Sequence, residues 1–191
     1  MRNMIIILNL LFSAAVVTQA QETQTQVKSQ KSYWELEADP VAYALNGFSV
    51  HAVRVQHRMR FDLGVFGLQV PESFNANKGF EVHSRGAGLK VNYLLNSKET
   101  WFAGAGFGYL NNTIRKRESS LTQVQHTIGA GVHVGYRIYL FRNFNYGKIY
   151  LTPWISMDYN KALKTIQFNG ETYKTVPLSF FPTVHIGYSF K

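Results

Sequence analysis

Ser49 and His51 are the residues of this 191-residue chain best placed for nucleophilic chemistry. They stand two positions apart, so in a β-strand both side chains point to the same face. A serine hydrolase needs a nucleophile, a base within hydrogen-bond reach and a third group that orients the base. Glu35 or Glu37, on a segment predicted to be a neighbouring strand, is the candidate third group. The alternative interpretation, which we favour, is that these are ordinary polar side chains lining the inside of a folded domain.

The remaining histidines give no stronger indication of a reactive site. His133 and His185 share the polar faces of their predicted strands, where Asp62 or Asp158 is the expected partner. The chain contains no cysteine, which excludes disulfides, thiolate metal sites and a cysteine nucleophile. The histidines are scattered and not grouped with metal-ligand spacing. We therefore predict no metal site and no cofactor.

The element most clearly defined by the sequence is the segment 122–140, in which side chains alternate by chemistry. An alternation with period two is typical of a β-strand with one apolar and one polar face. A tilted strand of roughly 9–11 residues spans a bilayer, so this one is long enough to cross and project beyond it. The apolar face holds Val124, Ile128, Ala130, Val132, Val134, Tyr136, Ile138 and Leu140, and the other holds Gln123, Gln125, Thr127, Gly129, Gly131, His133, Gly135 and Arg137.

The same alternation predicts eight strands in all. The predicted strands cover residues 32–38, 48–56, 57–67, 86–95, 101–109, 122–140, 149–159 and 183–190. In the second strand the apolar residues change face after Ala52, so that Val53 and Val55 replace Val50 on the apolar side, and we expect a β-bulge there. Short and long connections alternate along the chain, as in outer-membrane barrels with tight inner turns and longer outer loops. The long connection near Asp39 has the pattern of a short helix, and Asn169-Gly170 predicts a tight hairpin.

Three features place the apolar face on the outside of the predicted barrel. The polar face is rich in glycine, which makes room inside a narrow barrel for neighbouring charged side chains. Aromatic residues lie toward strand ends on the apolar face, as in the interfacial belts of membrane barrels. Apolar residues also occupy every second position of the last strand up to Phe190. We therefore predict an all-β fold, a closed antiparallel up-and-down transmembrane β-barrel of eight strands, in preference to a soluble lipocalin-like barrel with an apolar interior.

The first twenty residues have the pattern of an export signal. Arg2 supplies a positive start, residues 5–17 are mostly apolar, and Thr18-Gln19-Ala20 offers small residues before a cleavage point. The polar segment 21–31 is predicted to be a flexible mature N-terminus. Residues 32–191 are predicted to form the barrel domain.

The predicted lumen carries charges of both signs. Because unpaired charges in a narrow lumen are costly, we expect a salt-bridged, largely plugged interior and no wide pore. The chain has 20 Lys and Arg against 11 Asp and Glu, which in an exported protein suits anionic lipid headgroups better than nucleic acid. The predicted lumen network consists of Arg54, Arg58, Arg60, Asp62, Lys90, His133, Arg137, Asp158 and His185.

The export signal, the eight strands and the closing segment Thr183-Val184-His185-Ile186-Gly187-Tyr188-Ser189-Phe190 together resemble the small outer-membrane barrel proteins of the OmpA, OmpX and OmpW kind. In that class such a C-terminal strand is the signal read by the barrel-assembly machinery. The resemblance assigns this role to Val184, Ile186, Tyr188 and Phe190, although here Lys191 follows the final aromatic residue. It implies residence in the outer membrane, with outer-membrane lipid and lipopolysaccharide as partners.

These observations predict a protein that is not an enzyme. Its polar, largely plugged lumen leaves a structural, surface-interaction or small-solute role to the outer loops, with a surface ligand unidentified. One alternative is an outer-membrane lipid hydrolase or acyltransferase built on Ser49 and His51. A second alternative is a narrow channel for small or hydrophobic solutes.

Overall fold

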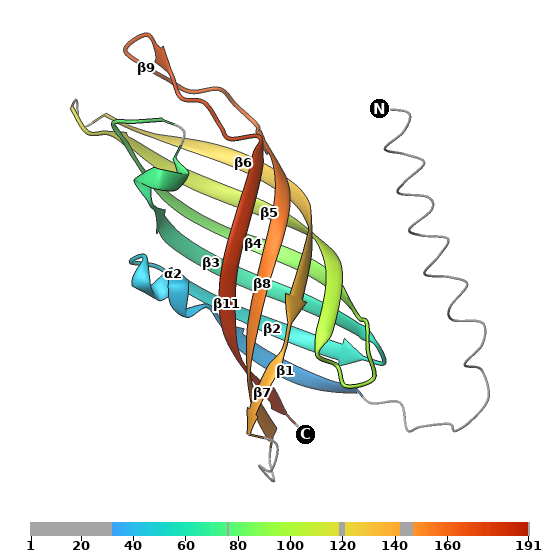
Figure 1. Ribbon diagram of the computed structural model, residues 1–191. Helices are drawn as coiled ribbons and strands as arrows, with labels where there is room; N and C mark the ends of the chain where they lie inside the picture. The colour runs from blue at the N-terminus through green and yellow to red at the C-terminus, as the bar shows by residue number, and fades with distance from the viewer. Residues whose placement is uncertain (1–31, 76, 119–120, 142–146, 191) are drawn as a thin grey trace, which may run out of the picture. The chain divides into compact units, whose positions relative to one another are not determined.

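The computed structural model describes residues 32–75, 77–118, 121–141 and 147–190 (Figure 1). The predicted export signal 1–20 and flexible segment 21–31 lie outside the described residues and remain predictions. The eight long strands are β1 (Ser32–Ala38), β2 (Phe48–Gln56), β3 (Met59–Val70), β4 (Phe80–Leu94), β5 (Trp101–Lys116), β6 (Thr122–Tyr136), β8 (Gly147–Ala162) and β11 (Leu178–Phe190).

The long strands form a closed ring in which every pair of neighbours is antiparallel. Strands β1 to β6 pair in sequence order, β6 pairs with β8, and β8 pairs with β11. The ring closes because β1 pairs with β2 on one side and with β11 on the other. The predicted eight-stranded, up-and-down antiparallel barrel is therefore confirmed. The long sixth strand is interrupted at Arg137 and continues as β7 (Ile138–Phe141), which also pairs with β8.

Strand β2 is regular, and the predicted β-bulge in it is wrong. Its register with β1 and with β3 continues without a shift from one end to the other. Val53 and Val55 consequently point into the barrel and are fully buried, whereas Arg54 points outward, 5.1 Å from the centre of the Trp34 ring. The apolar residues change face because the inner surface of the barrel is itself apolar at this end.

Three of the connections predicted to be long are long, namely 39–47 after β1, 71–79 after β3 and 163–177 after β8. The predicted long connection after Leu110 is wrong, because β5 runs on to Lys116 and only residues 117–121 separate it from β6. Strands β3, β4, β8 and β11 also run further toward the loops than the alternation indicated. The long connection after β1 contains helix α2 (Pro40–Ala44), whose first turn is capped by the Asp39 side chain, which accepts a hydrogen bond from the Val41 amide. A 3₁₀ turn, η1 (Glu72–Phe74), follows β3. Asn169 and Gly170 both have positive φ and connect β9 (Gln167–Phe168) to β10 (Glu171–Thr172), as the hairpin prediction required.

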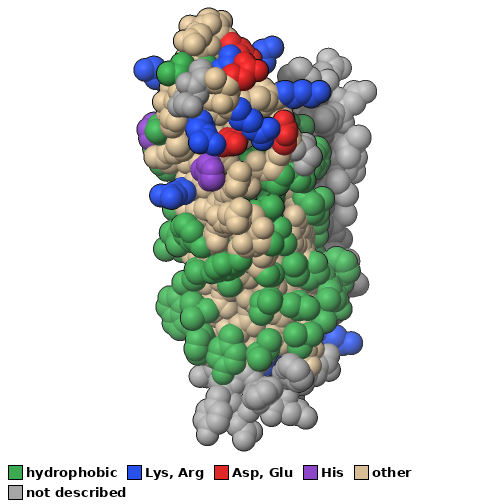
Figure 2. Space-filling model, turned by 90° about the vertical axis from the view of Figure 1, so that its left-hand side faces the viewer, with side chains coloured by type: hydrophobic (Ala, Val, Ile, Leu, Met, Phe, Trp, Pro, Cys, Tyr) green, Lys and Arg blue, Asp and Glu red, His purple; other side chains and the backbone are tan. Residues whose placement is uncertain are grey.

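The outer wall of the barrel is apolar. Val132, Leu89 and Phe61 expose 55%, 50% and 41% of their surface. Figure 2 shows one side of this wall as a broad apolar zone, with charged and histidine side chains gathered beyond one end of it. Phe61 lies on β3, Leu89 on β4 and Val132 on β6. The predicted inside-out arrangement is therefore present on these three strands.

The inside of the barrel has apolar clusters at both ends. The cluster at the turn end is formed by Val53, Val55, Leu94 and Phe102. The cluster at the loop end, called the loop-end cluster below, is formed by Phe80, Val82, Ile114, Ile166 and Phe168. The last two residues belong to the β9–β10 hairpin region, which packs on the projecting ends of β4 and β5. Polar side chains fill the space between the two clusters.

Within the described residues there is no helix of the length and apolar character needed to cross a bilayer.

Candidate functional site: the charged lumen

Two glutamates on β1 organise the charges inside the barrel. Glu35 and Glu37 are two residues apart, so both side chains point inward, where they are almost completely buried. Arg60 of β3 donates from Nε and Nη2 to Oε2 of Glu35 at 3.1 and 3.0 Å, and it also pairs with Glu37. Arg137 pairs with the other oxygen of Glu35. The two carboxylates thereby hold two buried guanidinium groups.

Glu37 extends this network from β1 to the last two long strands of the chain, β8 and β11. Its Oε1 accepts a hydrogen bond of 2.9 Å from the Tyr150 hydroxyl, and its Oε2 lies 2.9 Å from Nδ1 of His185. Tyr150 comes from β8 and His185 from β11. The Glu37 side chain therefore ties β1 to two strands that lie far away in the sequence.

A second group of charges surrounds Asp62 on β3. Lys90 on β4 places its Nζ 3.1 Å from Oδ2 of Asp62, and Nδ1 of His51 lies 2.8 Å from Oδ1. Nε2 of His51 lies 3.0 Å from the Ser49 hydroxyl oxygen. The His51 and His185 rings are 4.7 Å apart, so this group adjoins the one around Glu37.

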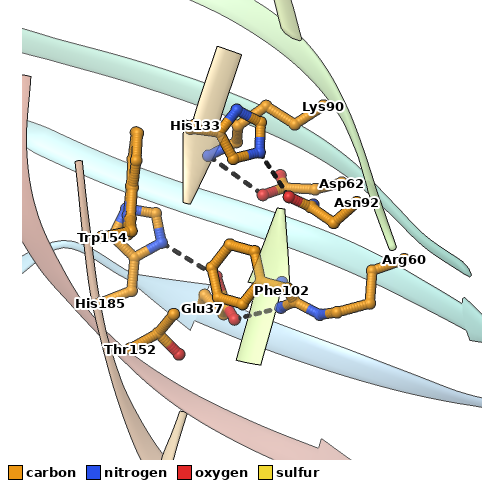
Figure 3. A pocket seen from close by; sticks show the side chains of 10 residues that line it. All are labelled: Glu37, Arg60, Asp62, Lys90, Asn92, Phe102, His133, Thr152, Trp154 and His185. Carbon is orange, nitrogen blue, oxygen red and sulfur yellow. Dashed lines mark hydrogen bonds and ion pairs between the residues drawn. The ribbon is translucent and has the colours of Figure 1, made fainter. Parts of the chain in front are cut away.

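Little space is left where the two groups meet (Figure 3). Lys90 lies over the Trp154 ring, 4.5 Å from its centre, and His133 hydrogen-bonds to the Asn92 side chain. The void between these side chains has a volume of about 10 Å³, which is room for about one water molecule. The Thr152 hydroxyl lines this void and has no hydrogen-bond partner among the described residues.

The charges of this site balance. Three carboxylates, on Glu35, Glu37 and Asp62, face three cationic groups, on Arg60, Arg137 and Lys90. Burial of a charge is tolerated when the charge is paired and its remaining hydrogen bonds are made. All six groups are paired, and among the described residues Nε of Arg137 is the one buried side-chain nitrogen that has no hydrogen-bond partner. The site is thus a charge-balanced network of side chains in the lumen.

The structure brings most of the predicted lumen residues to the inside of the barrel. Arg60, Asp62, Lys90, His133, Arg137 and His185 lie in the network, and Asp158 lies nearer the loop end, hydrogen-bonded to Ser156. The predicted partners of the two histidines were wrong. His133 binds Asn92 and His185 binds Glu37, because strand register, which the sequence does not reveal, decides which side chains meet.

Two predicted lumen residues lie elsewhere. Arg54 is on the outer face of β2, where its guanidinium stacks on Trp34. Arg58 is exposed in the turn between β2 and β3. Both were predicted to lie in the lumen because they are charged. Charge does not indicate an inward position near the turn end, where outward-pointing arginines reach the edge of the apolar wall.

Glu35, Glu37 and Tyr150 are the network residues that sequence reasoning missed or placed in another role. The two glutamates entered only as orienting groups for His51. The signal for their true position was present, because in the segment Trp34-Glu35-Leu36-Glu37 the carboxylates alternate with apolar residues. The alternation with Ile149 and Leu151 likewise places Tyr150 on the inner face of its strand, but nothing in the sequence indicates that its partner is Glu37.

Ser49, His51 and Asp62 have the connectivity of a serine hydrolase triad, with Asp62 in the place predicted for Glu35 or Glu37. The exposed fractions of the three residues are 3%, 6% and 2%. The same Asp62 carboxylate is bound by Lys90, and Ser49 does not line the central void. The contacts therefore fit a hydrogen-bond chain within the plug better than an accessible nucleophile. Among the described residues, no three His, Asp or Glu side chains are grouped so as to hold a metal ion.

Comparison with known proteins adds little to this description. No protein-family model matches the chain, and no curated protein matches it. Among solved structures the chain is similar to Neisserial surface protein A (NspA), with 14% sequence identity and a TM-score of 0.47 over 84% of this chain and 96% of that one. A similarity of this size supports no conclusion about function, so the proposals below rest on the barrel itself.

Proposed function

We propose that the protein is a non-enzymatic outer-membrane β-barrel that seals its own lumen and presents its long loops at the surface. The observation that carries this proposal is the combination of an apolar outer wall with a neutral, buried plug. A structural or surface-interaction role follows, because the loops are the part of such a molecule left free to meet other molecules.

The outer wall supports a membrane location. Monomeric soluble proteins rarely expose contiguous apolar patches larger than a few hundred Å². Here outward apolar side chains occur on every long strand, among them Leu36, Val50, Leu63, Leu89, Phe107, Val132, Met157 and Ile186. Only closed barrels and helices satisfy all backbone hydrogen bonds within lipid, and the closed ring meets this condition.

The export signal predicted for residues 1–20 favours the outer membrane as the membrane concerned. The outward positions Val184, Ile186, Tyr188 and Phe190 on β11 are the ones we propose the barrel-assembly machinery to read. Replacing Tyr188 and Phe190 with alanine should lower the fraction of folded, membrane-inserted protein. Replacement of Leu63 and Val65, outward residues of β3, serves as the matched control.

Fractionation and electrophoresis test the location. The full chain should be recovered with outer membranes and should migrate differently in detergent gels before and after heating, as folded barrels do. Recovery as a folded protein from the periplasm without detergent would refute the proposal. In planar bilayers the protein should give no steady conductance. Regular channel openings would contradict a sealed lumen and favour the narrow-channel alternative.

Lipid hydrolysis or acyl transfer is the second candidate, favoured by the 3.0 and 2.8 Å contacts that connect Ser49, His51 and Asp62. A fluorophosphonate probe distinguishes it from the plug. Labelling of the folded wild type that is lost in Ser49→Ala and kept in Ser156→Ala, another buried lumen serine, would establish a nucleophile. Absence of labelling, together with an unchanged lipid A acylation profile in cells with and without the chain, supports the non-enzymatic role.

A further inference from the structure

The outward-facing residues at the loop-side edge of the apolar wall form a cationic belt. On four neighbouring strands the next outward position beyond the apolar series is polar or basic: Arg85 on β4, Asn111 on β5, His126 on β6 and Lys161 on β8. The cationic belt, as the term is used below, consists of Arg85, Asn111, His126 and Lys161. The residues that precede them on the wall are Ala87, Tyr109, Ile128 and Tyr159.

The members of the belt are neighbours in space. Arg85 is the direct partner of Asn111 in the β4–β5 register, and Asn111 is the direct partner of His126 in the β5–β6 register. Lys161 is the partner of Ile128, two residues along β6 from His126. Directly opposite and diagonal side chains on one sheet face lie within about 5 to 8 Å of each other. The belt is therefore continuous across β4, β5, β6 and β8.

The belt carries charge that the described part of the protein leaves uncompensated. Further toward the loops, cations are paired with glutamates: Arg115 with Glu81, Lys116 with Glu171, and Arg117 with Glu72 and Glu81. Arg85 and Lys161 are exposed, and neither forms an ion pair with any residue in the described ranges. Figure 2 shows basic and histidine side chains where the apolar surface ends.

We propose that the cationic belt binds the phosphorylated headgroup of an outer-leaflet lipid whose acyl chains lie on the apolar wall below. This inference rests on the proposed function, since it requires the wall to be in a membrane. The Arg85 guanidinium and the Lys161 ammonium match phosphate oxygens, with Arg85 able to donate two parallel hydrogen bonds. Asn111 adds an amide donor, and the Tyr109 hydroxyl, 2.6 Å from Nδ1 of His126, holds the imidazole at the edge of the wall. Phe107 and Met157 offer exposed apolar surface to the acyl chains.

Native mass spectrometry of the full, folded chain in a mild non-ionic detergent tests the inference. The probe is diphosphoryl lipid A, compared with the same lipid after removal of its phosphates and with inorganic phosphate. We expect the diphosphoryl lipid to bind, the dephosphorylated lipid to bind much more weakly and inorganic phosphate not to bind. Each basic side chain near an anionic lipid surface contributes about fivefold in affinity, so Arg85→Gln/Lys161→Gln should bind roughly 30-fold more weakly.

The matched control is Arg58→Gln/Lys98→Gln, which removes the same charge from exposed turns at the other end of the barrel. It should leave the affinity unchanged. Equal binding of the phosphorylated and dephosphorylated lipids by folded wild type, or equal loss in both double variants, overturns the inference while the proposed function stands. If inorganic phosphate binds as tightly as diphosphoryl lipid A, the belt is a site for a soluble anion and the inference is overturned. A chain that is folded and soluble without detergent overturns the proposed function and the inference together.

Discussion

The charged lumen and the loop-end cluster occupy the same barrel but are assembled in opposite ways. The charged lumen joins residues far apart in sequence, such as Glu35 with Arg137 and Glu37 with His185, and these contacts form only when β1 has closed against β11. The loop-end cluster joins the loop-side ends of β4 and β5 to the β9–β10 hairpin region. The first region therefore reports on closure of the whole barrel, whereas the second reports on local order at the loops.

The difference also concerns the kind of interaction. Paired charges hold the lumen, so removal of one partner leaves an uncompensated buried charge. Apolar packing holds the loop-end cluster, where Phe80 contacts Phe168 and Tyr173 with ring centres 5.1 and 5.6 Å apart. Burial in this cluster raises the pKa of Tyr173 above its ordinary value. The two regions should consequently respond to different mutations and in different measurements.

Removal of the shared carboxylate in the lumen should give the largest effect. Glu35→Gln preserves shape but leaves Arg137 without its ion-pair partner and Arg60 with one partner. We expect the free energy of unfolding, measured by urea titration in lipid vesicles, to fall by about 3–5 kcal/mol. The control Glu81→Gln removes a carboxylate from an exposed pair and should change the stability little. Equal stability of Glu35→Gln and the wild type would contradict the role of the network in closure.

Truncation in the loop-end cluster should act locally. Phe168→Ala removes a fully buried ring, so the packing of the hairpin should weaken by about 3 kcal/mol, or roughly 100-fold in local opening. Hydrogen exchange of the amides in residues 166–173 should show this loss, while the urea midpoint of the barrel stays unchanged. The exposed neighbour Leu163→Ala is the control. A parallel fall in the urea midpoint would show that the two regions are one cooperative unit.

Glycine replacements compare how tightly the lumen is filled along its length. A Cβ added at Gly187 would lie 2.3 Å from Cζ of Tyr150. Gly187→Ala must therefore displace the Tyr150 ring, whose hydroxyl donates a hydrogen bond to Glu37. We expect a loss of about 1–3 kcal/mol in unfolding free energy. At Gly108 the nearest atom lies 3.6 Å away, so Gly108→Ala should cause almost no change. Similar losses at both positions would mean that the lumen is filled evenly.

The smallest effect is expected at Thr152. Its buried hydroxyl has no partner among the described residues, so Thr152→Val removes an unsatisfied polar group and keeps the shape of the side chain. Stability should rise by about 1 kcal/mol. Thr183→Val is the comparison variant, because the Thr183 hydroxyl donates a hydrogen bond to the Asp39 carboxylate at 2.7 Å. Its free energy of unfolding should fall by about 1.5–3 kcal/mol. A loss at Thr152 would indicate that its hydroxyl binds a water molecule in the central void.

The sequence by itself determined the number, order and inside-out character of the strands. A side-chain period of two is a property of extended backbone, so alternation reveals the two faces of a strand without any partner. The Asn169-Gly170 hairpin and the short helix after Asp39 were likewise encoded locally, in residues that favour positive φ and helix capping. The inward position of Arg60, Asp62, Lys90 and Arg137 followed from the same alternation.

Only the tertiary structure decided which charges meet. Asp62 reaches His51 because β2 and β3 pair in a register that places Val53 opposite Asp62, and Glu37 reaches His185 because closure sets β1 beside β11. The exceptions at Arg54, Val53 and Val55 have a related cause. Alternation assigns a side chain to a face, but the environment of that face changes from one end of the barrel to the other, and the position of a residue between those ends depends on how all eight strands pair.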